Sequence, residues 1–149
     1  MISVKDKTNI LSHNIWSCGD LTHNLNGFIV NSSERNVAST ERSVNGDYSV
    51  RLTPEEDNYA MTTINYTFEE EGTYLLKCKC LNTGISDAKV IIRDSENTVI
   101  ESINVPVSNQ FQEYSIEVTI SSENVNQILF RTAMSDSHLY VDDINLSIQ

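Results

Sequence analysis

The sequence predicts an all-β protein built as a sandwich of two antiparallel sheets with roughly eight strands. Its residue usage is rich in Ile, Val, Thr, Ser and Asn and very poor in Ala, which suits half-buried strands and polar turns rather than helices. Short apolar runs recur with turn-forming residues between them, a spacing that favours a sandwich over a βαβ series. Because 149 residues can bury one sizeable core but not two, we expect residues 1–149 to form a single domain.

Turn residues separate the expected strands. The segments 88–93 and 98–107 flank the turn Asp94–Asn97 and therefore predict a hairpin. The first 45 residues are less regular, with strand signals only around Ile10–Trp16 and at Phe28–Val30. Elsewhere we expect strands at 48–52, 59–68, 73–81, 88–93, 98–107, 111–120, 126–134 and 139–148.

Three cysteines make an odd count, so at least one thiol stays unpaired in a monomer. Cys78 and Cys80 stand two apart in an expected strand, where their Cα atoms are roughly 6 to 7 Å apart, a poor geometry for a disulfide. We expect reduced core residues. The alternative is a metal site formed by Cys18, Cys78 and Cys80 with one of His13, His23 or His138.

The charge balance excludes some classes of partner. A net charge of -11 repels phosphate backbones and anionic lipid, so we expect neither nucleic acid nor a membrane surface as a partner. No apolar run approaches the roughly 18 to 20 residues of a membrane-spanning helix, so we expect no membrane insertion. The opening residues Met1–Lys7 are not followed by the apolar segment of a signal peptide.

The sequence contains none of the common catalytic motifs, such as a phosphate-binding glycine loop, a nucleophile elbow or a zinc-binding His pair. The acidic runs Glu69–Glu71 and Glu55–Asp57 adjoin turn residues and are most simply solvated loops. A pair of glycosidase acids is the alternative. We therefore expect a protein that is not an enzyme.

One carboxylate has an unusual register. In the expected strand 139–148, Asp142 shares its parity with the apolar residues Ile144 and Leu146, which predicts that it points toward the core. A buried carboxylate needs a cation or several hydrogen bonds. Either a hard cation such as Ca²⁺ or backbone N–H groups of neighbouring loops would satisfy Asp142.

Four segments occur in an order that resembles a known family. They are Gly46-Asp47-Tyr48-Ser49-Val50-Arg51-Leu52, Gly72-Thr73-Tyr74-Leu75-Leu76, Phe111-Gln112-Glu113-Tyr114 and Tyr140-Val141-Asp142-Asp143-Ile144. Together they resemble the jelly-roll carbohydrate-binding modules of the galactose-binding-like group, over about two-thirds of the chain.

The resemblance implies a jelly-roll sandwich, often with a structural Ca²⁺ near the first Asp of the closing motif, which is Asp142. Asn9 and Asp47 are the candidates for further ligands. The sequence departs from the family at residues 9–14, which contain no acidic residue where the family often has a Phe-Glu pair.

Sugar binding in such modules combines aromatic rings that stack on a pyranose with polar side chains that bind its hydroxyls. Trp16 and Tyr59 lie outside the clear core registers and are the candidate stacking residues, whereas the other strand tyrosines share parity with core residues. We expect the outward-facing residues that could line a concave polar face to be Asn65, Lys77, Lys79 and Arg131.

The resemblance favours a non-catalytic carbohydrate-binding module that targets a polysaccharide or a cell-surface glycan. Such a module would belong to a larger multimodular protein or assembly and act outside the cell, at the cell surface or on a virion. The alternative is a structural or protein-interaction sandwich of a phage tail, virion or adhesin, without a sugar site, because fold does not determine function.

Overall fold

A computed structural model describes residues 28–30, 36–39, 49–54, 59–66, 68, 70–121, 125–133 and 138–148. For 28–30, 36–39, 62, 64, 65 and 126 it describes the backbone and not the side chain. The described part of the chain forms ten strands and no helix. No described helix is therefore long and apolar enough to cross a membrane.

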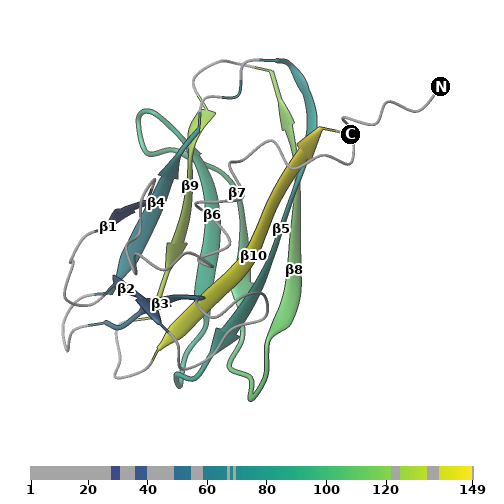
Figure 1. The fold of residues 1–149 in the computed structure, drawn as a ribbon. Coiled ribbons are helices and arrows are strands. Elements are labelled where there is room, and N and C mark those ends of the chain that lie inside the picture. The colour runs from purple at the N-terminus through teal and green to yellow at the C-terminus, as the bar shows by residue number, and fades with distance from the viewer. Residues whose placement is uncertain are drawn as a thin grey trace.

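The strands form two antiparallel five-stranded sheets that face one another (Figure 1). We name the two layers sheet A and sheet B. Sheet A has the order β1 (Phe28–Val30), β4 (Met61–Asn65), β9 (Val125–Arg131), β6 (Ala88–Asp94) and β7 (Val99–Val105). Sheet B has the order β2 (Asn36–Ser39), β3 (Ser49–Leu52), β10 (Leu139–Ile148), β5 (Gly72–Asn82) and β8 (Gln112–Ile120).

This architecture confirms the expected all-β sandwich, with ten strands instead of roughly eight. The strand signal at Phe28–Val30 corresponds to β1, and the predicted hairpin is β6 with β7. The short strand β2 was not predicted, because four residues are too few to show an alternation. The signal around Ile10–Trp16 lies outside the described residues.

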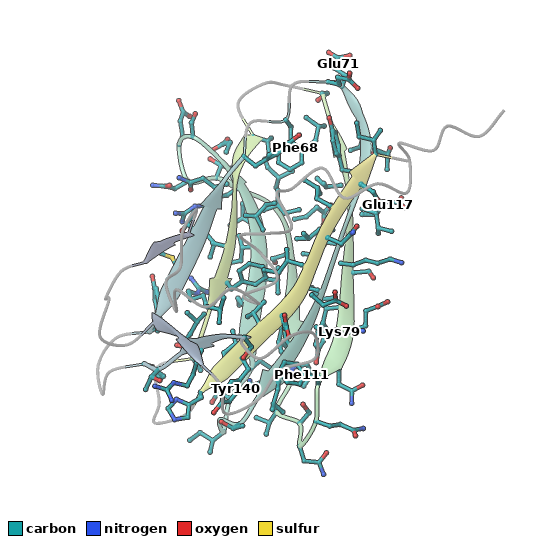
Figure 2. All side chains as sticks on the ribbon, in the orientation of Figure 1. Phe68, Glu71, Lys79, Phe111, Glu117 and Tyr140 are labelled. Atoms are coloured by element: carbon teal, nitrogen blue, oxygen red, sulfur yellow. The ribbon has the colours of Figure 1, made fainter. Side chains whose placement is uncertain are left out.

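The core lies between the two sheets, where side chains fill the space (Figure 2). Phe68 and Tyr74 meet edge to face with their ring centroids 4.8 Å apart, and both are buried. The Tyr74 hydroxyl donates a hydrogen bond of 2.7 Å to the carbonyl oxygen of Glu70, so burying this tyrosine leaves no unmet donor. Removing such a packed aromatic side chain costs about 3–5 kcal/mol.

The longest strand, β5, follows the alternation that the sequence predicts. Tyr74, Leu76, Cys78 and Cys80 belong to the core, while Lys77 is exposed on the outer face. Residues of one parity therefore fill the core, and residues of the other parity form the outer face of sheet B.

The expected register is wrong in β10. Leu139 and Val141 face the core, but the pairing with β5 shifts between Asp142 and Asn145, and Ile144 is the next core residue. Asp143 adopts a left-handed conformation (φ 54°), which an Asp tolerates better than most residues do, and inserts a bulge. Because the bulge reverses the parity, Tyr140 and Asp142 lie on the outer face of sheet B and not on its core face.

Candidate functional site

A hollow of about 210 Å³ lies at one end of the outer face of sheet A. It combines an aromatic ring, two cationic side chains and one carboxylate with two smaller residues. We call it the Tyr59 pocket. Its lining consists of Tyr59, Asp87, Lys89, Arg131, Thr132 and Ala133.

Strand pairing brings the two cations of the Tyr59 pocket together. Arg131 is the last residue of β9, and Lys89, near the start of β6, is its direct cross-strand partner. The preceding and following residues on these strands, Phe130 and Val90, are buried in the core. Since side chains alternate between faces, Lys89 and Arg131 both point away from the core.

Tyr59 is held beside Arg131 by two hydrogen bonds between the residues that follow them, Ala60 and Thr132. The Thr132 amide donates to the carbonyl oxygen of Ala60 at 3.0 Å, and the Ala60 amide donates to Thr132 Oγ1 at 2.9 Å. The Arg131 guanidinium carbon then lies 4.8 Å from the centre of the Tyr59 ring, within cation–π range. The two hydrogen bonds are buried, so they position the Tyr59–Arg131 pair firmly.

The charges of the Tyr59 pocket are not neutralised by ion pairs. Lys89 Nζ donates to Asn104 Oδ1 at 2.8 Å, a neutral partner on the adjacent strand β7. Neither Lys89 nor Arg131 forms an ion pair within the described part of the chain. The one carboxylate among its described lining residues, Asp87, is exposed immediately before β6. The Tyr59 pocket therefore offers cationic donors, an aromatic surface and one anionic acceptor.

Beyond the Tyr59 pocket, the outer face of sheet A becomes apolar and then polar again. Ile91 and Leu129 are cross-strand partners on this face and are only 5% and 1% exposed. Further along, Arg93 Nε donates to Gln127 Oε1 at 2.5 Å. The two polar ends of the face are thus separated by buried apolar side chains.

Comparison with known proteins identifies the fold. No protein-family model and no curated protein matches the sequence. The solved structure of TmCBM61 in complex with β-1,4-galactotriose has a TM-score of 0.69 at 12% identity, and the match covers 95% of this chain and 99% of that chain. The CBM22-1 xylan-binding domain from Paenibacillus barcinonensis Xyn10C has a TM-score of 0.63 at 10% identity, with 89% and 91% covered. The chain has the jelly-roll fold of carbohydrate-binding modules.

The carbohydrate-binding-module fold also occurs within larger chains. The enzymatically active domain of bacteriophage CBA120 tailspike protein 4 matches with a TM-score of 0.65 at 17% identity. That match covers 93% of this chain but only 22% of the tailspike chain. A module of this size can therefore be one part of a multidomain protein.

The predicted sugar-contacting residues are divided between the two sheets of the jelly-roll fold. Tyr59 and Arg131 meet in the Tyr59 pocket, and Asn65 lies on β4 of the same sheet. Lys77 and Lys79 lie on β5, on the outer face of sheet B. The predicted residues thus do not form one site, because a sandwich of two sheets has two outer faces and outward-facing residues of different strands can lie on either. Trp16 lies outside the described residues.

Asp142 is fully buried in the module, although it is on the outer face of sheet B. Its Oδ1 accepts a hydrogen bond of 2.8 Å from the Asp143 amide. The described residues contain no group of three or more His, Cys, Asp or Glu placed to hold a metal ion. The other ligand candidates, Asn9 and Asp47, lie outside the described residues, so calcium binding stays a prediction.

The cysteines of β5 are reduced core residues, as expected. Cys78 and Cys80 are both buried, with their sulfur atoms 3.8 Å apart. The hydrogen bond between the thiols, together with burial, raises the pKa of Cys80 well above its ordinary value. Burial also raises the pKa of Tyr114, which packs against the same core. Cys18 lies outside the described residues.

Sequence reasoning did not single out four residues of the Tyr59 pocket, namely Asp87, Lys89, Thr132 and Ala133. A signal for Lys89 was present, because it has the outward parity in the predicted strand 88–93. The sequence did not indicate that β6 pairs with β9, because 30 residues (95–124) separate the two strands and they meet only in the folded sheet.

Proposed function

We propose that this protein is a non-catalytic carbohydrate-binding module that contacts its glycan at the Tyr59 pocket. The observation that supports this most directly is the Tyr59–Arg131 pair, an aromatic ring and a guanidinium held together at the edge of a pocket. In the fold of carbohydrate-binding modules, such a pair has the chemistry that a pyranose needs.

A pyranose presents apolar C–H groups and a rim of hydroxyls, so a binding site must offer both apolar surface and hydrogen-bonding groups. Tyr59, which is half-buried, supplies aromatic surface. Arg131 and Lys89 supply hydrogen-bond donors, and the exposed carboxylate of Asp87 accepts hydrogen bonds from hydroxyls. Glycoside hydrolysis ordinarily uses two carboxyl groups, and Asp87 is the one carboxylate among the described lining residues, which favours binding without cleavage.

The size of the Tyr59 pocket limits what it can hold. Its volume of about 210 Å³ is below the roughly 300–1,000 Å³ of pockets that enclose drug-sized ligands. It therefore suits one or two sugar units, such as the end of a glycan chain or a side branch, rather than a long stretch of polysaccharide.

The second candidate is a structural or protein-interaction module of a larger extracellular or virion protein. Two observations favour it. The chain resembles one part of a phage tailspike, and β7, at the edge of sheet A, exposes the apolar side chains of Val99 and Ile100. An exposed apolar edge strand is a common contact surface for another chain.

A glycan array separates the two candidates. We expect the full chain to bind a related set of glycans, with binding lost in Tyr59→Ala and retained in the control Lys77→Gln, whose site is on the other sheet. Melting curves would establish that each variant is folded. If folded wild-type protein binds no glycan with or without calcium, the structural module is the correct function.

A further inference from the structure

We propose that the Tyr59 pocket selects an acidic sugar, with the carboxylate or sulfate of one sugar unit held between Lys89 and Arg131. This inference rests on the proposed function and adds the class of ligand. It follows from the charges of the pocket, from their fixed positions and from the charge of the rest of the protein.

The local charge of the Tyr59 pocket is opposite to that of the protein. The chain has 21 Asp and Glu against 10 Lys and Arg, yet the described residues that line the pocket include two cations and one carboxylate. The two cations are direct partners across β6 and β9, so their positive charges lie close together on one face. Like charges side by side repel one another, and a bound anion between them would remove that repulsion.

Lys79, on the other sheet, already has an acidic partner. It pairs with Asp143, its Nζ lying 3.2 Å from Oδ2. In the described part of the chain, Lys89 and Arg131 have no carboxylate partner. In a protein with an excess of acidic residues, two adjacent cations that line a pocket without a paired carboxylate are suited to an anionic ligand.

Both cations are held in place before a ligand arrives. The Tyr59 ring supports the Arg131 guanidinium, and Asn104 Oδ1 accepts a hydrogen bond from Lys89 Nζ. Guanidinium groups bind carboxylate and sulfate oxygens through parallel N–H donors, and such charge-assisted hydrogen bonds are about twice as strong as neutral ones. A preorganised pair should therefore discriminate strongly between an acidic sugar and its neutral counterpart.

The rest of the protein limits how many charges the ligand can carry. Asp87 stands at the pocket, and the chain has a net charge of -11, so a polyanion with a charge on every unit would be repelled by most of the surface. A single charge is affected little, because fields from charges more than about 8–10 Å away are screened at physiological salt. The geometry therefore favours one acidic unit flanked by neutral sugars, or at a chain end.

NMR titration of the full chain with matched methyl glycosides tests this proposal. The probes are methyl β-D-glucuronide and methyl β-D-galacturonide, each compared with its neutral glucoside or galactoside, and galactose 6-sulfate for the sulfate arm. We expect at least one acidic probe to bind about tenfold more tightly than its neutral counterpart and to shift the amide signals around Lys89 and Arg131. The uronides and the sulfated sugar together identify which anionic group is preferred.

Three variants that remove one positive charge each locate the effect. Lys89→Gln and Arg131→Gln should abolish most of the acidic preference, whereas Lys77→Gln, on the outer face of sheet B, should leave it unchanged. Arg131→Lys keeps the charge but loses the planar donors, so it should retain only part of the preference. Chemical-shift spectra of each variant confirm its fold.

Equal affinity for acidic and neutral probes would overturn the acidic-sugar proposal while leaving the proposed function intact. An equal loss in Lys77→Gln and Lys89→Gln would also overturn it, since general electrostatic attraction would then explain the preference. If neither kind of probe binds and the glycan array is silent, the proposed function itself fails.

Discussion

The outer faces of sheets A and B use their charged residues differently. On sheet B, Lys79 pairs with Asp143, and the neighbouring carboxylate Asp142 is buried. On sheet A, Lys89 and Arg131 face a pocket and have only neutral or aromatic partners in the described part of the chain. Lys79 of sheet B thus has an acidic partner within the protein, whereas Lys89 and Arg131 of sheet A have none among the described residues.

The difference shows why outward parity alone does not identify a binding site. Lys79 and Arg131 both occupy outward positions of long strands, and the sequence makes them equivalent candidates. Their roles diverge because the bulge in β10 places Asp143 beside Lys79, while no acid lies across the sheet from Arg131. Changes on sheet B should therefore affect stability, and changes in the Tyr59 pocket should affect binding.

The largest effect expected on sheet B comes from Asp142. If calcium is bound there, a chelator removes a stabilisation of about 2.7 kcal/mol at a calcium concentration 100 times its Kd, and lowers the Tm by several degrees. Differential scanning calorimetry with and without chelator measures this. In Asp142→Asn the chelator effect should vanish. A wild-type Tm that does not respond to chelator would refute calcium binding at Asp142.

The matching change on sheet A is Arg131→Ala. It should reduce glycan affinity by about 10- to 100-fold, equivalent to roughly 1.4–2.8 kcal/mol, because it removes both the cation and the support of the Tyr59 ring. Stability should change by less than about 1 kcal/mol, since the side chain is only half-buried. Calorimetric titration and urea unfolding report the two quantities. A large loss of stability with normal binding would reverse the contrast between the faces.

The buried thiol of Cys80 should make the free energy of unfolding depend on pH. Because the folded protein raises the pKa of Cys80, its contribution to stability is fully present below the unfolded thiol pKa of about 8.5 and is lost as pH rises toward the folded pKa. The free energy of unfolding should therefore fall above about pH 8.5. In Cys80→Ala this part of the decline should disappear, and a decline of unchanged slope would exclude Cys80 as its origin.

The smallest effect is expected from the Lys79–Asp143 ion pair. The two side chains are 34% and 41% exposed, so solvent screens their attraction. A double-mutant cycle of Lys79→Gln and Asp143→Asn should give a coupling of about 0.2–1 kcal/mol, smaller in high salt. Glycan binding should be unchanged in all three variants. Weakened binding would extend the site to sheet B.

Much of the fold could be predicted from the sequence because the strands of this protein alternate clearly. The core faces of β5 and β8 follow the predicted parity, with Leu76 and Ile116 both buried. The candidate site was predicted only in part. Tyr59 and Arg131 were each identified as candidate contact residues. Their contact with one another depends on the hydrogen bonds between Thr132 and Ala60, which are 72 positions apart.

Asp142 illustrates how a correct expectation can rest on an incorrect register. The sequence predicted that this carboxylate is buried, and it is, but on the outer face of sheet B rather than in the core. A strand of ten residues was assumed to alternate without interruption, and the left-handed conformation of Asp143 breaks that alternation. Nothing in the local pattern distinguishes an Asp that continues a strand from an Asp that forms a bulge.

The sequence by itself determined most of the strands, the β-sandwich class and the core position of Cys78 and Cys80, because these depend on residue type and on a period of two along the chain. Only the tertiary structure decided which outward residues meet. Lys89 and Arg131 become neighbours because β6 pairs with β9, whereas Lys79 forms an ion pair with Asp143, which lies at the bulge of β10. Local alternation specifies the face of each side chain, but partners across a sheet are set by long-range pairing, which minimises the free energy of the whole sandwich.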